Sequence, residues 1–390
     1  MDWLRERTWA TLAGAAIGDA LGGATEGWTP EQIQQRHGGP VTGIVGPFYD
    51  DWRNARPIAP YHKGDGHITD DTLMTHALVQ VYATRRTHLD AYAMASDFVP
   101  LLIGEQVWIP EFERQALILQ RIFLAEKWLV ARLHYGHVDP REAGVGNIVN
   151  CGAAMYVAPV GVVNAGNPPA AYAEAIDLTG AHQSSYGREA AGVFAAAVAA
   201  ALSPRASVAT VVEAVLDVAH DGTRAAIGAV VAAVRAMPAD ADQDLVRLAL
   251  RAAIQPYDTV GDNYRAPAMD ARRPSRTKSI EELPVALGFC LAGGGDFRTA
   301  VLGAVNYGRD ADSIATMAGA VCAALGGAAA VPTEWVSAIE RASRIDLDVV
   351  AEQLSAAAVE IIEADLIAYE ARRTMIDTLR AETAATAASR

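Results

Sequence analysis

Residues 189–202 read EAAGVFAAAVAAAL, and this stretch decides the fold class because alanine fills most of it. Alanine is the best helix former, and its short side chain lets neighbouring helices approach closely. A second alanine-rich run covers 315–331. Both runs are shorter than the roughly 18 to 20 apolar residues needed to span a bilayer, and alanine is only weakly hydrophobic. The sequence therefore predicts tightly packed core helices and no membrane partner.

Helical patterns recur along most of the chain, whereas strand signals are almost absent, with 41–45 as the best candidate. There is no internal repeat and no Pro/Ser linker. We therefore expect an all-α fold: a single-domain, compact, orthogonal helical bundle over residues 1–380, followed by a frayed tail at 381–390. The expected helices include 2–22, 70–84, 88–103, 111–134, 168–178, 186–202, 207–219, 222–236, 241–254 and about 347–380.

Charge and cysteine usage exclude several classes of protein. The net charge of −14 argues against stable nucleic-acid binding, which depends on clustered Lys and Arg. Cys151, Cys290 and Cys322 are isolated and show no CxxC spacing, so a disulfide framework is not expected. The first apolar run is interrupted by Gly18 and Asp19, unlike a secretory signal. We expect a soluble protein in a reducing cytoplasm.

Two stretches share an unusual pattern of acids at the entry to a helix. Capping such an entry needs one Ser, Thr or Asp, and Thr69 could cap the first helix unaided. The remaining carboxylates are then surplus, and gathering four of them in an apolar protein costs several kcal/mol unless cations neutralise them. Hard divalent ions such as Mg²⁺ and Mn²⁺ prefer oxygen ligands of this kind. The residues concerned are Thr69, Asp70 and Asp71 in GHITDDTLM (66–74), and Asp310, Asp312 and Ser313 in GRDADS (308–313).

Two further segments are candidates for function. Glu26, in GDALGGATEGW (18–28), follows directly after the predicted end of the first helix, so its side chain could reach into a site. Residues 256–278 form a polar stretch with a basic end, which is read as a solvated loop or, alternatively, as a lid or phosphate-contacting loop.

The order of these motifs resembles the ADP-ribosylglycohydrolase family, which includes the glycohydrolase that reactivates ADP-ribosylated dinitrogenase reductase and the crystallin J1 relatives. The resemblance covers GAAIGDALGGATE (14–26), TDDT (69–72), NCGAAMYVAPVG (150–161) and AVNYGRDADSIATMAGA (304–320). It implies an all-α domain with a binuclear Mg²⁺ or Mn²⁺ centre. The implied metal ligands are Thr69, Asp70 and Asp71 on one side, and Asp310, Asp312 and Ser313 on the other.

The implied reaction is hydrolysis of a glycosidic bond at the anomeric carbon of a ribose, in an ADP-ribosylated protein, nucleic acid or small molecule. Its transition state would be oxocarbenium-like, with a carboxylate that deprotonates water and assists the leaving group. Glu26, Asp70, Asp71 and Asp312 are the implied catalytic carboxylates. The implied substrate-binding residues are Asn150, Gly152, Ala153, Met155, His182, Gly308 and Arg309.

The chain departs from the family pattern at two positions. Arg309 brings a bulky cation next to the predicted centre, and Tyr156 replaces a basic residue. These departures leave two alternatives open: a hydrolase acting on a ribosyl metabolite without ADP-ribose, and a non-catalytic, crystallin-like ligand-binding protein. A metal-dependent phosphatase is a weaker alternative, because the usual histidine ligands are missing. The oligomeric state is left open.

Overall fold

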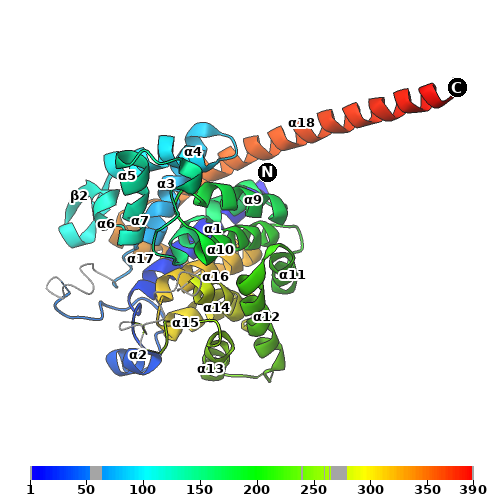
Figure 1. Cartoon of the computed structure of the whole chain (residues 1–390). Helices are drawn as coiled ribbons and strands as arrows, with labels where there is room; N and C mark the ends of the chain where they lie inside the picture. Colours follow the sequence, from blue (N-terminus) through cyan, green and yellow to red (C-terminus); the bar gives the residue numbers. More distant parts are fainter. Residues whose placement is uncertain are drawn as a thin grey trace.

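A computed structural model describes residues 2–52, 64–238, 240–258, 260–262, 264 and 279–388, and these form an all-α domain (Figure 1). Most of the polar stretch predicted as a loop or lid, residues 265–278, lies outside them. The longer helices are α1 (Asp2–Gly23), α2 (Pro30–His37), α3 (Asp70–Arg85), α9 (Pro168–Thr179), α10 (Ser185–Ala201), α11 (Val208–Val218), α12 (Asp221–Ala236), α13 (Gln243–Ile254), α14 (Ser279–Ala292), α15 (Phe297–Tyr307), α16 (Ala311–Gly326), α17 (Thr333–Ser343) and α18 (Leu347–Ala388).

Helices α1 and α16 lie in the centre and pack together through small residues. Gly14, Gly18 and Gly22 recur every four residues and therefore lie on one side of α1. A Cβ atom at Gly18 would overlap the carbonyl oxygen of Ala315, and one at Gly22 would overlap that of Ala311. The contact pairs the end of α1 with the start of α16. This close approach brings the acids after α1 next to those that begin α16.

The alanine-rich helix α10 is buried along most of its length, from Ala190 to Ala201, as its composition predicts. It packs against α9, α11 and the short helix α8 (Ala158–Val163), while α12, α13 and α14 form an adjoining layer (Figure 1). Because alanine side chains are short, these helices pack closely enough to form one continuous hydrophobic core.

The segment between α3 and α8 differs from the predicted pattern. The expected helix 111–134 is present only in its second half, as α7 (Leu124–Leu129) and the π-helical turn Val130–Tyr135. Before it lie a hairpin of β1 (Gln106–Ile109) and β2 (Arg114–Leu117) and the short helix α6 (Ile118–Arg121). The expected helix 88–103 is present in pieces, α4 (Ala91–Ala93), a π-helical turn and α5 (Val99–Gly104). Strands of four residues are too short to show a period of two in the sequence.

Two other predictions differ from the structure. Residues 41–45 do not form a strand; the side chain of Asn306 hydrogen-bonds both backbone groups of Val41 instead. Residues 381–388, predicted as part of a frayed tail, are helical and continue α18, because AETAATAA is rich in the best helix former. In the described part of the chain, no helix is long and apolar enough to cross a membrane.

Candidate active site

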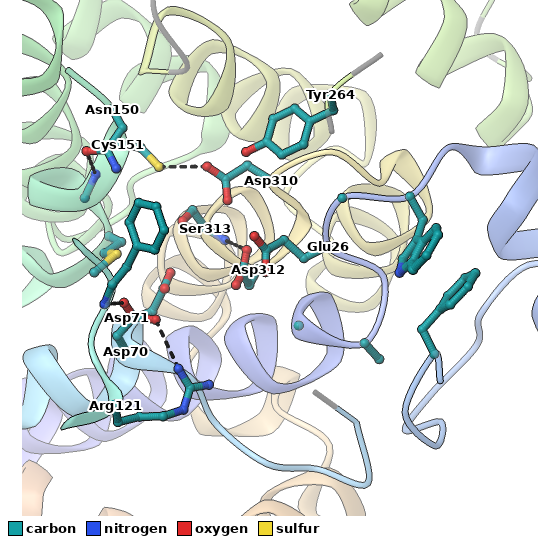
Figure 2. Close-up of a pocket in the computed structure, with 18 of the residues that line it drawn as sticks. Glu26, Asp70, Asp71, Arg121, Asn150, Cys151, Tyr264, Asp310, Asp312 and Ser313 are labelled. Carbon is teal, nitrogen blue, oxygen red and sulfur yellow. Dashed lines mark hydrogen bonds and ion pairs between the residues drawn. The ribbon is translucent and has the colours of Figure 1, made fainter. Parts of the chain in front are cut away.

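A cavity of about 370 Å³ lies where the starts of α3 and α16 meet the end of α1 (Figure 2). This volume is in the range of pockets that bind small molecules. Both acidic motifs contribute to its wall, although more than two hundred residues separate them in the sequence. The lining residues from the two motifs are Asp70, Asp71, Asp310, Asp312 and Ser313, and Glu26 joins them.

The start of α3 is capped from a distant helix. Thr69 occupies the N-cap position, but its side chain makes no capping hydrogen bond. The buried carboxylate of Asp19, on α1, instead accepts hydrogen bonds from the backbone N–H of Thr69 at 2.9 and 3.0 Å and from that of Thr72 at 3.1 Å. It also accepts one from the Thr72 hydroxyl at 2.5 Å. The prediction that Thr69 caps this helix is therefore wrong, because a tertiary contact supplies the acceptor.

The two aspartates of α3 have different surroundings. Asp70 accepts a hydrogen bond from the backbone N–H of Phe123 at 2.8 Å, and its other oxygen is 3.7 Å from the guanidinium of Arg121. Asp71 is buried, and one of its oxygens accepts from the Thr69 hydroxyl at 3.2 Å. No described residue donates a hydrogen bond to its other oxygen, Oδ1. Burial, together with the charges of nearby carboxylates, raises the pKa of Asp71 well above its ordinary value.

The GRD turn fixes the acids at the start of α16. Gly308 and Arg309 both have left-handed backbones, with φ of 69° and 59°. A side chain at Gly308 would overlap the carbonyl oxygen of Trp28. The backbone of Arg309 pairs with the segment that follows α1, donating to Trp28 O at 3.1 Å and accepting from Gly27 N–H at 2.6 Å. Glu26 is thereby held beside Asp310 and Asp312, with one carboxylate oxygen of each within 4.8 Å of the others.

These donors suit a hard divalent cation. Oxygens from Asp19, Asp71 and Asp312 also lie within 4.8 Å of one another, but those of Asp19 are already occupied by the α3 cap. The unpartnered, buried Oδ1 of Asp71 is the kind of atom that a cation would satisfy. Arg121 is the only basic side chain among the described residues that line the cavity, and it faces Asp70. The donor set therefore fits Mg²⁺ or Mn²⁺.

Aromatic side chains line another part of the cavity. Trp28 and Phe48 stack with ring centroids 3.4 Å apart and planes 10° from parallel, and Tyr49 meets both rings edge-on. These rings were not among the predicted site residues. The aromatic lining residues are Trp28, Phe48, Tyr49, Trp52, Phe123 and Tyr264.

Glu126 is a cavity residue that the sequence reasoning missed. Its carboxyl group is buried, and a Cβ atom at Gly152 would overlap it, so glycine at 152 leaves room for the acid. Burial, followed by the charge of Asp70, raises the pKa of Glu126 well above its ordinary value. Nothing in the local sequence marks this glutamate, because it lies on a short helix, α7, whose sequence pattern indicates packing only.

His182 lies behind Glu126 and does not line the cavity. Its Nε2 is 3.7 Å from Glu126 Oε1, and its Nδ1 is 3.1 Å from the Tyr156 hydroxyl. Burial lowers the pKa of His182 to about 3, so the ring is neutral and forms no ion pair with the glutamate. His182 and Tyr156 are therefore buried side chains next to Glu126 that do not themselves line the cavity.

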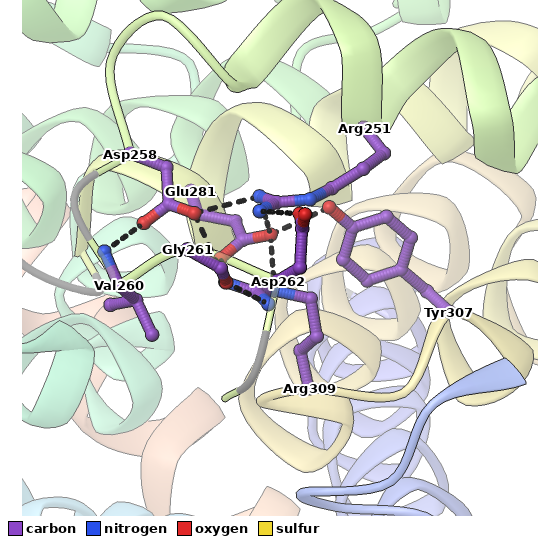
Figure 3. A network of polar contacts seen from close by, with 8 residues as sticks. All are labelled: Arg251, Asp258, Val260, Gly261, Asp262, Glu281, Tyr307 and Arg309. Carbon is purple, nitrogen blue, oxygen red and sulfur yellow. Dashed lines mark hydrogen bonds and ion pairs between the residues drawn. The ribbon is translucent and has the colours of Figure 1, made fainter. Parts of the chain in front are cut away.

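Arg309 points away from the cavity into a buried ion-pair network (Figure 3). Its guanidinium is 2.7 Å from Glu281 and 3.1 Å from Asp258, and it donates to Gly261 O at 2.8 Å. Arg251 contacts the same two acids, at 3.1 and 2.8 Å. Arg309, the cation expected beside the predicted metal centre, is therefore paired with acids outside the cavity. Arg309 contributes to the cavity indirectly, since its guanidinium lies 5.1 Å from the ring centroid of Tyr264.

The remaining predicted residues divide into two groups. Asn150, Gly152 and Met155, around the 3₁₀ helix Cys151–Tyr156, line the cavity as the family resemblance implies. Thr69, Ala153 and Gly308 are buried and do not line it. Three further residues of the wall were not predicted individually. Arg121 had no sequence signal, whereas Cys151 belongs to the NCGAAMYVAPVG motif and Tyr264 to the 256–278 stretch.

The fold and the cavity together define the class of this protein: it is an all-α domain whose cavity is lined by acids and aromatic rings. The model of the ADP-ribosylglycohydrolase family matches residues 2–363, and the chain therefore belongs to that family. It is 26% identical over 347 residues to an uncharacterised protein of Archaeoglobus fulgidus, covering 84% of this chain and 90% of that one. It is 27% identical over 353 residues to the uncharacterised protein YegU of Escherichia coli, covering 88% and 92%.

A solved structure is also similar to this fold. A chain titled as an ADP-ribosylglycohydrolase-related protein complex matches with a TM-score of 0.55 at 19% identity, over 92% of this chain and 100% of that one. At that identity the likeness concerns the fold, and it agrees with the family membership.

Proposed function

We propose that this protein is a divalent-metal-dependent glycohydrolase that cleaves the bond at the anomeric carbon of a ribose in an ADP-ribosylated substrate. The observation that carries the proposal is the convergence of Asp70, Asp71, Asp310 and Asp312 on one cavity, with a buried and unpartnered Asp71 oxygen. Family membership supplies the reaction class.

Two Mg²⁺ or Mn²⁺ ions would be held by Asp70, Asp71, Asp310, Asp312 and Ser313, with Thr69 behind them. When bound, the ions would supply Lewis acidity toward ribose hydroxyls and would lower the pKa of a water molecule.

The chain's own residues would orient the substrate and move protons. The aromatic side chains Trp28, Phe48 and Tyr49 offer ring faces for a nucleobase. Asn150 and Gly152, which line the same cavity, would contact the ribose phosphate part. Glu126, whose raised pKa favours the protonated form, is suited to donate a proton to the leaving group, and Glu26 is suited to accept one from water.

The alternative of a ribosyl hydrolase without ADP-ribose was motivated by Arg309 and Tyr156. Neither side chain lines the cavity, so neither gives a reason to prefer that substrate class. The non-catalytic alternative is opposed by the four aspartates, which would be costly to keep together without a cation.

A substrate panel tests the proposal. Purified protein with Mg²⁺ or Mn²⁺ is assayed against ADP-ribosyl-arginine, ADP-ribosyl-serine, O-acetyl-ADP-ribose and simple nucleosides. Release of ADP-ribose that is lost in Asp312→Asn supports the proposal. Hydrolysis of a nucleoside with no turnover of any ADP-ribosyl compound would overturn it.

A further inference from the structure

A second, smaller pocket of about 270 Å³ lies between α3, the β1–β2 hairpin and the junction of α17 and α18. It shares no lining residue with the acidic cavity. Its volume is just below the usual range of small-molecule pockets, so it suits a ligand smaller than a nucleotide.

The lining of this pocket contrasts with the charge of the chain. The net charge is −14, yet no carboxylate lines the pocket among the described residues. Its polar lining consists of one arginine, one histidine, one serine, one tryptophan and four glutamines. A pocket that holds a cation and excludes acids, in an acidic protein, favours an anionic ligand.

The carboxylates near the pocket are engaged with other groups. Glu105 accepts a hydrogen bond from the side-chain amide of Gln80 at 2.9 Å. At the α17–α18 junction, Glu340 accepts from the backbone N–H of Leu347 at 3.0 Å. Asp346 accepts from the backbone N–H of Val349, also at 3.0 Å. These acids therefore cap helix α18 or hold a neighbouring amide and do not line the pocket.

Arg344 is the cation of the pocket. It follows directly after α17, and its guanidinium lies 3.5 Å from the ring centroid of Trp108. No described residue forms an ion pair with it. The contact with the ring restrains the guanidinium, whose N–H groups match the oxygens of a carboxylate or a phosphate. Arg344 is thus placed to bind an oxoanion.

Neutral hydrogen-bonding groups surround this cation. Burial alone lowers the pKa of His76, to about 4, so its ring is neutral and can donate one N–H; no described residue hydrogen-bonds it. The side-chain amides of Gln106, Gln115 and Gln353 also make no hydrogen bond within the described chain. One cation with several neutral donors is suited to a small molecule that carries an oxoanion and further polar groups.

The short helix α6 connects this pocket to the acidic cavity. Its first residue, Ile118, lines the pocket, and its last, Arg121, lines the cavity 3.7 Å from Asp70. The backbone N–H of Phe123, two residues further on, donates to Asp70 as well. A ligand that restrains one end of so short a helix also restrains the other end.

We infer that this pocket is a second binding site, separate from the acidic cavity, for a small carboxylate or phosphate compound, and that α6 transmits its occupancy to the cavity. Neither a metal ion nor turnover enters the inference, so it stands or fails independently of the proposed reaction.

Isothermal titration calorimetry of the metal-free protein tests the site. Succinate and glycerol phosphate are the probes, one for each source of the oxoanion, and without metal neither can bind to an ion in the cavity. We expect one of them to bind at one site per chain in the millimolar range or below. If neither probe binds at millimolar concentration, the inference is overturned.

A pair of arginine variants locates the binding. Arg344→Gln is expected to weaken it by about tenfold or more, because a charge-assisted hydrogen bond is lost. Arg205→Gln is the matched control, since Arg205 is also an exposed arginine with a left-handed backbone and no ion pair in the described chain. It is expected to bind as wild type does. An Arg344→Gln variant that binds equally well would contradict the site.

The charge of the ligand is tested at Gln115, which is exposed on β2 and pairs with Trp108 across the hairpin. Gln115→Glu is expected to weaken binding by about tenfold or more, because it sets a carboxylate against the anion. Gln115→Lys, of similar length, is expected to bind as well as wild type or better. Equal weakening by both substitutions would rule out an anionic ligand.

Hydrogen–deuterium exchange tests the transmission through α6. The bound probe is expected to slow exchange of the backbone N–H groups of residues 121–123, which do not line the pocket. No such slowing is expected when the probe is added to Arg344→Gln. Unchanged exchange at 121–123 in wild type with the probe bound would exclude the link to the cavity.

Discussion

Removing the carboxylate of Asp19 is expected to destabilise the metal-free protein strongly, because this residue caps α3 from α1. In Asp19→Ala, the buried N–H groups of Thr69 and Thr72 lose their acceptor. Each buried, unsatisfied donor costs about 1–3 kcal/mol. The Thr72 hydroxyl can rotate to another acceptor, and relief from burying a charge offsets part of the loss. The expected decrease in the free energy of unfolding is therefore about 3 kcal/mol.

The matched comparison is Thr69→Val, which keeps the shape of the side chain. Its hydroxyl donates a hydrogen bond to Asp71 at 3.2 Å and also interacts with the carboxylate of Asp19, so the expected cost is about 1 kcal/mol, below that of Asp19→Ala. Urea unfolding in the presence of a chelator, followed by far-ultraviolet circular dichroism, measures both variants without a contribution from metal binding. If Thr69→Val costs more than Asp19→Ala, Thr69 is the cap and the reasoning is refuted.

Three further predictions concern packing, pH and the cavity. Gly18→Ala is expected to cost about 2 kcal/mol or more, because the new Cβ overlaps the backbone of Ala315. Gly228→Ala is the control: its new Cβ meets no atom within 4 Å, so the change is expected to be neutral or stabilising. Thermal unfolding compares the two variants, and equal effects would contradict the close approach of α1 and α16. The hydrogen bond with Glu174 raises the pKa of His88 to about 9 from an unfolded value of about 6.5, so its stabilisation is complete below about pH 6.5 and is lost as the pH rises through 9. Since the His88 side chain is 38% exposed, the contribution is only about 1 kcal/mol. The difference in the free energy of unfolding between wild type and His88→Gln, measured with urea, should shrink by that amount from low to high pH. A constant difference would exclude the charged pair. Glu126→Gln is expected to leave metal-free stability nearly unchanged and to lower kcat by about 10²–10⁴-fold if the residue donates the proton, and an unaltered kcat would remove it from that role.

The helices were predictable where a local pattern decides the structure. The alanine content of α10, and the four-residue recurrence of glycine in α1, lead directly to buried helices that pack closely. The hairpin at 106–117 was not predictable, because each strand has only four residues and the turn between them contains Pro110. The tail at 381–388 was predicted to fray, but it is helical, and its alanine content favours a helix.

The acids of the candidate site were predictable because they exceed what helix capping needs. The surplus at Asp70, Asp71, Asp310 and Asp312 is visible in the sequence, and the structure brings all four to one cavity. The cap supplied by Asp19 and the carboxyl group of Glu126 were not predictable. Both depend on contacts between segments distant in the sequence, and no local pattern encodes such a contact.

The direction of the Arg309 side chain, which points away from the cavity, was also not predictable from the sequence. A cation next to two aspartates predicted to bind metal suggested a substrate contact, but its partners, Asp258 and Glu281, come from another part of the chain. The left-handed backbone at Arg309 lets Asp310 face the cavity while the guanidinium lies in the network behind it.

Divalent-cation binding tests the central claim most directly. Metal-free protein is titrated with Mn²⁺, and the bound ion is counted by electron paramagnetic resonance, which does not require turnover. We predict two ions for each wild-type chain, loss of binding in Asp312→Asn, and unchanged binding in Gly228→Ala. A wild-type chain that binds no Mn²⁺, or an Asp312→Asn variant that binds as many ions as wild type, would contradict the account.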